Sequence, residues 1–405
     1  MRGCPFWPNL PEVGDFSTPA GYGEPNPTPE PFLSSRLAPE QWPGSRRRRS
    51  SNGPTLTAGG IPVDHLNQVQ AIFPKYGIIP RNGIDAVGCY TPSMRVKILG
   101  SAAGGAFPQW NCACPNCRSL RAGTFRGKAR SQTQVAISAD SHSWFLLGAS
   151  PDLRAQIEST PELHPRADGN STRHSPIAGS ILLNADIDHV LGLLLLRELQ
   201  PLRVHATKSV RRILTKDNSM FAMLERVSDQ VTWIDLDVGA QFPLLDPAGK
   251  TSGLKCRALP LGEHYPAYVS PGRRSQLGMG ESSLCLMIES PAGKRLAYMP
   301  AVPRIDHRML ALLDSADAIL FDGTFWSADE LISIRGSGAS AWDMGHVPVS
   351  SPAGSLARLA QLEHPRKIYV HINNTNPMLN EASPEYREVR EAGWEIAEDG
   401  WQFDL

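Results

Sequence analysis

The stretch "SILLNADIDHVLGLLLLREL" (Ser180–Leu199) places polar side chains between two segments that both favour burial. The apolar run 181–183 predicts a buried strand, and the apolar run 191–196 predicts the core-facing side of a helix. Asp186, Asp188 and His189 lie at the junction, which is the edge of a sheet where layered folds usually place a site. Asp188 could equally be a helix N-cap and His189 a core histidine, so the junction alone leaves both interpretations open.

Similar polar side chains follow other predicted strands. They are His264 in "LPLGEHYPAY", Asp322 in "AILFDGTFW", His346 in "DMGHVPVS" and His371 in "KIYVHINNTNPML", which also contains Asn376. Each is weak evidence alone, and an Asn-rich segment is also typical of a turn. Several nitrogen and oxygen donors at strand ends nevertheless suit Fe²⁺, Mn²⁺ or Zn²⁺.

A second cluster of possible ligands is "NCACPNCR", in which Cys112, Cys114 and Cys117 form a C-x-C-x-x-C pattern. Thiolates at this spacing can converge on one tetrahedral Zn²⁺, and Pro115 and Asn116 favour the turn that brings them together. A fourth ligand must come from elsewhere in the chain. Three reduced thiols or a redox pair are the alternatives, but we expect a structural zinc site.

The composition of the chain limits the classes of protein to which it can belong. Of its 405 residues 41% are hydrophobic, and 40 basic residues balance 40 acidic ones, which gives no support for binding to nucleic acid or to a membrane surface. No apolar run approaches the roughly 20 residues of a spanning helix, and the start lacks a signal-peptide pattern. We therefore expect a cytoplasmic protein.

Residues 1–93 differ in character from residues 94–405. The first segment is rich in Pro, Gly and Ser and contains the run "GSRRRRSSNG", which we expect to be a solvated tail rather than an anion site. We expect this segment to be a disordered extension, or a product of an overlong start assignment. At Met94 the sequence becomes "MRVKILGSAAGG", a strand followed by a Gly-rich turn, so the folded domain is predicted to begin there.

The folded part is predicted to be an α/β (α+β) domain. Strands and helices interleave, a helix is expected over 188–198, and "ESPAGKR" (289–295) reads as the turn of a hairpin. Hairpins combined with strand–helix units indicate mixed sheets flanked by helices.

These motifs resemble the metallo-β-lactamase fold superfamily. Its H-x-H-x-D-H motif aligns with residues 184–189, where Asp188 and His189 match while Asn184 and Asp186 stand in place of two histidines. His371 matches the late histidine of the superfamily, and the segment 298–300 lacks the aspartate that often bridges two metals. A dinuclear hydrolase site is therefore not expected.

A closer resemblance, from Met94 to Leu405, is to the pyrroloquinoline quinone (PQQ) biosynthesis protein B family. The strings that carry it are "MRVKILGSAAGGAFPQWNCACPNCR", "DHVLGLLLLREL", "ILFDGTFW", "MGHVPVS" and "VHINNTNPML". The resemblance implies an αββα sandwich and an iron-dependent, O₂-dependent hydroxylase of PQQ synthesis. Its implied substrate is the tyrosine of a Glu-Tyr unit from a precursor peptide.

The same resemblance implies roles for particular residues. Asp188, His189 and His371 would bind Fe²⁺, and the three cysteines would bind the structural Zn²⁺. The expected further contributors are Asp322, His346 and Asn376 for orientation or proton transfer, and Asp186, Asn184 and His264 for substrate contacts. Two histidines and one carboxylate with open positions are also what non-haem iron chemistry requires, independently of the family.

Other interpretations stay open at this level. A single metal can activate hydroxide, so a hydrolase of the same fold is one alternative. A carrier of PQQ or its precursor towards the periplasm is another. An acidic dipeptide would need a cation, for which Arg197, Arg304 and Arg335 are candidates. A homodimer is a further expectation.

Overall fold

The computed structural model describes residues 93–166, 173–198 and 200–405. The predicted extension lies outside the described residues except for Ser93, so the boundary at Met94 stays a prediction. In the described part of the chain, no helix is both long and apolar enough to cross a membrane.

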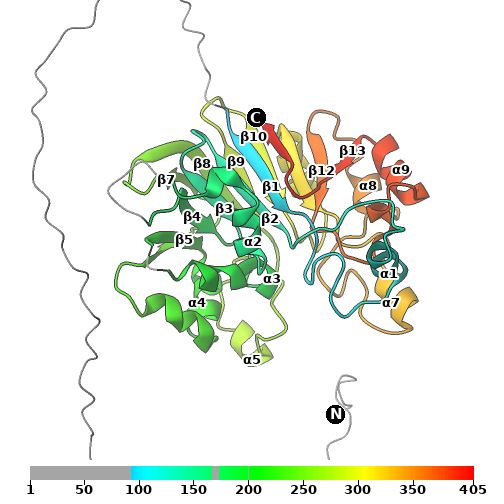
Figure 1. Cartoon of the computed structure of the whole chain (residues 1–405), viewed down its shortest axis with the longest axis horizontal. Helices are drawn as coiled ribbons and strands as arrows, with labels where there is room; N and C mark the ends of the chain where they lie inside the picture. Colours follow the sequence, from blue (N-terminus) through cyan, green and yellow to red (C-terminus); the bar gives the residue numbers. More distant parts are fainter. Residues whose placement is uncertain (1–92, 167–172, 199) are drawn as a thin grey trace, which may run out of the picture. The chain divides into compact units, whose positions relative to one another are not determined.

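Two seven-stranded mixed sheets make up the centre of the described domain (Figure 1). The first sheet has the order β14-β1-β2-β3-β4-β5-β6, and the second has the order β13-β12-β11-β10-β9-β8-β7. The strands of the first sheet are β1 Arg95–Gly100, β2 Gln134–Ser138, β3 Trp144–Leu147, β4 Ile177–Ile181, β5 Leu202–Ala206, β6 Val231–Asp235 and β14 Gln402–Asp404. The strands of the second are β7 Gln241–Leu245, β8 Thr251–Gly262, β9 Ser283–Glu289, β10 Arg295–Met299, β11 Ala318–Asp322, β12 Arg366–Val370 and β13 Trp394–Ile396.

Helices connect these strands and cover the outer faces of the sheets. The α-helices are α1 Pro115–Arg121, α2 Leu153–Glu158, α3 Ile187–Val190, α4 Lys208–Thr215, α5 Pro271–Arg274, α6 His307–Asp314, α7 Glu330–Arg335, α8 Ser355–Arg358 and α9 Pro384–Glu391. Short 3₁₀ helices are η1 Pro161–Leu163, η2 Leu191–Leu196, η3 Ser219–Glu225 and η4 Pro377–Leu379.

The core is divided into three buried layers, as alternation along the strands requires. Val96, Ile137 and Phe145 of the first sheet meet Leu286 and Leu320 of the second in the layer between the sheets. A second layer packs the first sheet against α2 and α4, and a third packs the other sheet against α6 and α9. The αββα sandwich expected from the sequence is confirmed.

The predicted hairpin around residues 289–295 is also confirmed, because β9 and β10 pair antiparallel across it. The predicted helix over 188–198 is wrong in its length. The α-helix ends at Val190, and residues 191–196 form a 3₁₀ helix. The N–H of Gly192 donates to Ala149 O, and a Cβ at Gly192 would lie 2.2 Å from Ser150 O, so close packing against the neighbouring loop breaks the α-helical ladder.

The topology brings several strand ends to one edge of the sandwich. β10, β11 and β12 are parallel, and β3, β4 and β5 are parallel within the other sheet. Carboxyl ends of parallel neighbours meet at the same edge. The segments that follow β4, β11 and β12 therefore converge, although they are far apart in sequence.

Candidate functional site

A cavity of about 650 Å³ opens at this edge. Apart from the three cysteines, nine site residues were predicted; six of them line the cavity and three do not. Those that line it are Asp186, Asp188, His189, His264, His346 and His371. The three that lie behind its wall are Asn184, Asp322 and Asn376, each almost fully buried.

Asp188, His189 and His371 direct three donor atoms to one point. His371 Nε2 lies 3.1 Å from Asp188 Oδ2, and His189 Nε2 lies 3.8 Å from the same oxygen. Donors that share an ion at bonds of about 2.1 Å lie roughly 3.0–3.5 Å apart, so the spacing is compatible with one metal. The two imidazole rings meet edge to face, with centroids 5.0 Å apart.

The side chain of Asn184 fixes the orientation of the His189 ring. Asn184 Oδ1 lies 3.0 Å from His189 Nδ1, which directs the other ring nitrogen, Nε2, towards Asp188. That Nε2 atom is buried and has no hydrogen-bond partner. Burial lowers the pKa of His189, which keeps the ring neutral as a metal ligand must be. Asn184 therefore orients His189 rather than facing the cavity.

His371 adopts a backbone conformation that a histidine seldom occupies. Its φ is +57°, in the left-handed region, as the chain leaves β12. Thr324 Oγ1 lies 2.7 Å from His371 Nδ1 and 2.9 Å from the backbone oxygen of His371. Thr324 was not predicted as a site residue, and its only sequence signal is its position two residues after Asp322.

The charge of Asp188 is stabilised by its neighbours. Burial alone would raise the pKa of Asp188, but its electrostatic interactions with the imidazoles of His189 and His371 and the hydrogen bond from His371 outweigh burial and hold the pKa well below its ordinary value. Gly104 packs against this carboxylate, and a Cβ there would lie 3.1 Å from Oδ2. The carboxylate is thus ionised and confined.

Asp322 also lies near His346 and His371, but its oxygens are already used. Oδ2 accepts from Val302 N and lies 2.7 Å from His346 Nδ1, while Oδ1 accepts from the N–H and the hydroxyl of Thr324. With both oxygens saturated, Asp322 is suited to orienting His346 rather than to binding metal. Burial would lower the pKa of His346, but the charge and hydrogen bond of Asp322 raise it above its ordinary value.

The remaining predicted residues take different positions. His264 Nε2 lies 3.7 Å from Asp186 Oδ1, and both side chains line the cavity. Asn376 donates to Gly323 O and accepts from Met378 N, so its side chain supports the turn after β12. At the end of β10, Ala301 lines the cavity, and no carboxylate of that segment does so in the described chain.

The cavity wall contains no lysine or arginine among the described residues, and the aspartates in it are Asp186, Asp188 and Asp343. Arg197 and Arg335 are exposed elsewhere, and Arg304 lines a separate cavity of about 690 Å³. The prediction that one of these arginines contacts the substrate is not supported by their positions.

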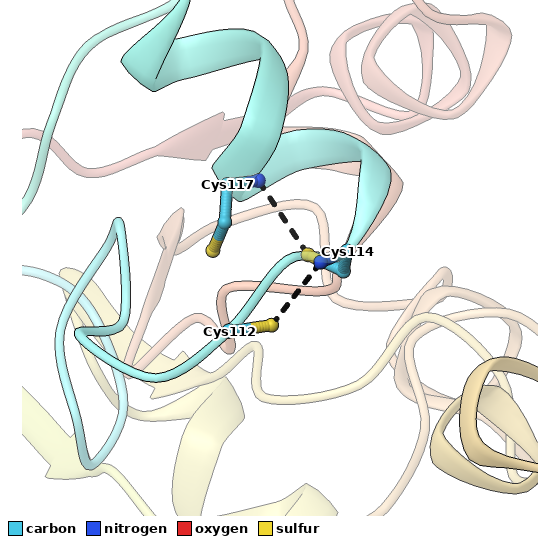
Figure 2. Close-up of side chains that lie close together, drawn as sticks. All are labelled: Cys112, Cys114 and Cys117. Carbon is cyan, nitrogen blue, oxygen red and sulfur yellow. Dashed lines mark hydrogen bonds between the residues drawn. The ribbon is translucent and has the colours of Figure 1, made fainter.

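The three cysteines gather at the start of α1 (Figure 2). Their sulfurs lie within 4.8 Å of one another, and the backbone N–H groups of Cys114 and Cys117 point at the sulfurs of Cys112 and Cys114. Burial raises the pKa of Cys114 to about 11, so a bound cation is needed to hold its thiolate at neutral pH. The donor set fits tetrahedral Zn²⁺, with one position left to fill.

The turn after β12 reaches this cluster as well. Asn374 Nδ2 lies 3.2 Å, 3.6 Å and 3.3 Å from the sulfurs of Cys112, Cys114 and Cys117. Asn116 Nδ2 donates to the backbone oxygens of Asn374 and Asn376. The turn that begins at His371 thus contacts both groups of ligands.

Comparison with known proteins agrees with this architecture. A family model of the beta-lactamase superfamily domain matches residues 143–372. The chain is 41% identical over 301 residues to coenzyme PQQ synthesis protein B of Methylobacterium nodulans, covering 74% of this chain and 96% of that protein. It is 40% identical over 312 residues to the protein of the same name from Methylorubrum extorquens, covering 77% and 100%.

Solved structures show the same relationship. The crystal structure of Zn²⁺-bound PqqB from Methylobacterium extorquens matches with a TM-score of 0.70 and 39% identity, covering 77% of this chain and all of that one. A diphosphatase of the PhnP family matches with a TM-score of 0.53 and 17% identity, covering 77% and 98%, which shows the fold alone.

Proposed function

We propose that this chain, which belongs to the coenzyme PQQ synthesis protein B family, is an iron-dependent oxygenase of PQQ biosynthesis. Its substrate is the tyrosine of a Glu-Tyr unit from a precursor peptide, and its product is the corresponding catechol. The names of the relatives support the pathway. The observation that carries the reaction type is the triad of Asp188, His189 and His371 facing one open cavity.

The donor set favours a single redox metal. Two histidines and one carboxylate that leave open positions are the ligands of non-haem Fe²⁺ oxygenases. Asn184 orients His189, and no carboxylate from the end of β10 lines the cavity in the described chain, so a second metal has too few ligands here. Fe²⁺ bound by this triad would supply the electron transfer to O₂ that protein side chains lack.

Hydroxylation of the tyrosine ring by O₂ requires a reductant. One atom of O₂ enters the ring as a hydroxyl group and the other leaves as water, which consumes two electrons and two protons. An external small-molecule reductant of the ene-diol class provides both. The protein's part is to hold the phenol beside the triad, limit the access of water and move protons.

His346, which is oriented by Asp322, is the residue that transfers protons. Asp322 holds Nδ1 of His346, which leaves Nε2 as the ring nitrogen available to the cavity. The raised pKa of His346 allows its ring to carry a proton near neutral pH. In this position His346 exchanges a proton with the phenol or with the developing catechol.

The charges of the cavity wall indicate how the peptide binds. With Asp186 present and no lysine or arginine lining the wall in the described residues, the favoured partner is the α-ammonium group of the peptide. No side chain of the described residues donates a hydrogen bond to the Asp186 carboxylate, and His264 Nε2 lies 3.7 Å from its Oδ1 atom, so the carboxylate is available. The glutamate side chain then points to solvent, and Tyr265 and Tyr268 flank the peptide.

The test is anaerobic loading of the purified protein with Fe²⁺, followed by O₂ and ascorbate with the Glu-Tyr dipeptide. We expect O₂ uptake and a catechol product in equal amounts. Hydrolysis of generic esters without O₂ uptake would instead indicate a hydrolase. Tight binding of PQQ that needs no Fe²⁺ and survives substitution of His371 would indicate a carrier.

The role of Asp186 is tested by changing the charge of the peptide. Asp186→Asn should raise KM for the free dipeptide by about 10-fold, since a charge-assisted hydrogen bond is lost. The N-acetylated dipeptide should react poorly with the wild type and be little affected by the substitution. Equal losses for both peptides would exclude recognition of the ammonium group.

A further inference from the structure

Asn373 lines the cavity of about 650 Å³, two residues after His371. Its backbone is fixed from two sides. The N–H of Asn373 donates to Thr324 O at 3.0 Å, and its carbonyl oxygen accepts from Asn376 N at 3.0 Å. The main freedom left to the residue is the direction of its carboxamide, which decides whether an N–H group or an oxygen faces the cavity.

The nitrogen end of the carboxamide is bound to the protein. Nδ2 of Asn373 donates to the hydroxyl oxygen of Thr375, and that hydroxyl donates to Oε1 of Glu330. A threonine hydroxyl has one proton. Because this proton is used on Glu330, the hydroxyl oxygen can only accept from Asn373. The opposite orientation of the carboxamide would place two oxygens together with no proton between them.

Glu330 is the buried end of this chain of hydrogen bonds. It is 7% exposed, and its second oxygen accepts from Trp326 N at 2.6 Å. Burial raises the pKa of Glu330, and hydrogen bonds from its neighbours, Asn373 among them, oppose that rise. The acid thus draws the N–H groups of Asn373 away from the cavity and leaves Oδ1 as the end that a ligand can reach.

The chemistry of Oδ1 indicates which group of a ligand it binds. Among the described residues, no N–H or O–H group donates to this oxygen. A carboxamide oxygen is a neutral acceptor, whereas an ammonium group is bound more strongly by the carboxylates in the same wall. A neutral donor therefore suits Oδ1. The position beside His371 is also the metal end of the cavity, where the ring that reacts must lie.

We propose that Oδ1 of Asn373 accepts a hydrogen bond from the phenolic O–H of the substrate, and that Thr375 and Glu330 fix the carboxamide for this contact. The inference rests on the proposed function. It makes Asn373 the residue that selects tyrosine over phenylalanine. A site that binds a substrate hydroxyl rejects the analogue without it, because the acceptor of the site is then left unpaired.

The experiment measures binding without turnover. The full chain is loaded with Fe²⁺ in the absence of O₂, and calorimetry gives Kd for the Glu-Tyr and Glu-Phe dipeptides. The wild type should bind Glu-Tyr at least about 10-fold more tightly. Asn373→Leu, which is nearly isosteric, should reduce this selectivity by about 10-fold. Asn380→Ala, in the same loop but outside the cavity wall, is the control and should keep the wild-type selectivity.

Two variants of Thr375 test how the carboxamide is oriented, without changing Asn373 itself. Thr375→Val removes the acceptor for Nδ2 and lets the carboxamide turn, so the preference for Glu-Tyr should fall by about 3- to 10-fold. Thr375→Ser retains the hydroxyl and should retain the preference. A general loss of structure at this turn would weaken binding of both dipeptides and leave their ratio unchanged.

The outcomes separate this contact from the proposed function. An unchanged preference in Asn373→Leu and Thr375→Val, with Glu-Tyr still bound, would overturn the contact and leave the proposed function in place. Equal weakening of both dipeptides would also overturn it, because Oδ1 would then accept from a peptide N–H. Failure of the wild type to bind either dipeptide would refute the proposed substrate, and the contact with it.

Discussion

The two ligand clusters of this protein differ in what surrounds them. The triad of Asp188, His189 and His371 lines a cavity of about 650 Å³, so positions around a metal there remain accessible. The cysteine cluster is packed into the core beneath α1, with Cys114 and Cys117 buried and Asn374 over the sulfurs. Open sites support chemistry, whereas closed sites support structure.

The difference also appears in the type of donor. Imidazole and carboxylate ligands suit a metal that changes oxidation state and exchanges ligands, while thiolates suit zinc that stays in place. One short turn connects the two clusters, since it begins at His371 and reaches the sulfurs through Asn374. Variants that affect one cluster but not the other are therefore the clearest test of the assignment.

The largest effect is expected for His371→Ala. Removing one of three ligands should abolish Fe²⁺ binding and catechol formation, while zinc stays at one per chain. Elemental analysis and product assay on the same preparation measure both. His364→Ala, an exposed histidine, is the control and should keep full activity. Catechol formation by the His371→Ala variant would refute the assignment of the iron ligands.

The Cys114→Ser variant should show the opposite change in metal content. The variant should lose zinc and keep iron, because the triad does not include this residue. Loss of a structural ion worth about 2–4 kcal/mol would lower the melting temperature by roughly 5–10 °C. Cys256→Ala, a buried cysteine outside the cluster, should retain zinc. Simultaneous loss of both metals would show that the clusters are not separate sites.

The Asp322→Asn variant tests the residue that orients His346, not the proposed iron ligands. Since both oxygens of Asp322 are used by hydrogen bonds, iron content should be unchanged. Misorientation of His346 should lower kcat by about 10- to 100-fold with little change in KM. His346→Gln should reproduce the loss, and the double variant should be no worse than either single one. Loss of iron in Asp322→Asn would instead make this carboxylate a ligand.

The smallest effect is expected for Glu330. This residue of α7 contacts the turn after β12, which connects the two clusters. Its carboxylate accepts hydrogen bonds from the hydroxyl of Thr375 and from Trp326 N. Burial raises the pKa of Glu330 to about 7. The folded protein therefore binds this proton more tightly than the unfolded chain does. The stabilisation is complete below about pH 4.5 and is lost as the pH rises towards 7.

Glu330→Gln should remove this contribution, which we expect to be on the order of 1 kcal/mol. Urea unfolding at pH 5 and pH 7.5 should show a smaller difference in the free energy of unfolding for the variant than for the wild type. Glu391→Gln, at an exposed position, is the control. An identical pH dependence in wild type and Glu330→Gln would contradict the assignment of the raised pKa.

Much of the site could be predicted from the chain alone. Residue types at strand ends placed Asp188, His189 and His371 among the candidate metal donors, and the family resemblance singled out these three. The C-x-C-x-x-C spacing predicted that the three sulfurs lie together, as they do. Both predictions depend on local geometry, because a strand end or a tight turn positions its own side chains. The loss of two histidines at Asn184 and Asp186 was also visible, and it pointed to a single metal.

Other features could not be predicted, because they depend on contacts between distant segments. Asn184 and Asn376 turned out to support ligands and turns rather than to face the cavity, and Thr324 was missed although it holds His371. The arginines considered for substrate binding lie away from the cavity. Side-chain direction at these positions is decided by packing across the sandwich, which strand and turn patterns do not report.

The sequence by itself therefore determined the fold class and separated the candidate nitrogen and oxygen donors from the candidate sulfur donors. Ligand chemistry is a property of residue type, and residue type can be read directly. Only the tertiary structure decided which donors meet. It brings Asp188 and His371, 183 positions apart, to 3.1 Å and sets Asn374 over the three sulfurs. These distances follow from two sheets packing face to face, and no local pattern encodes them.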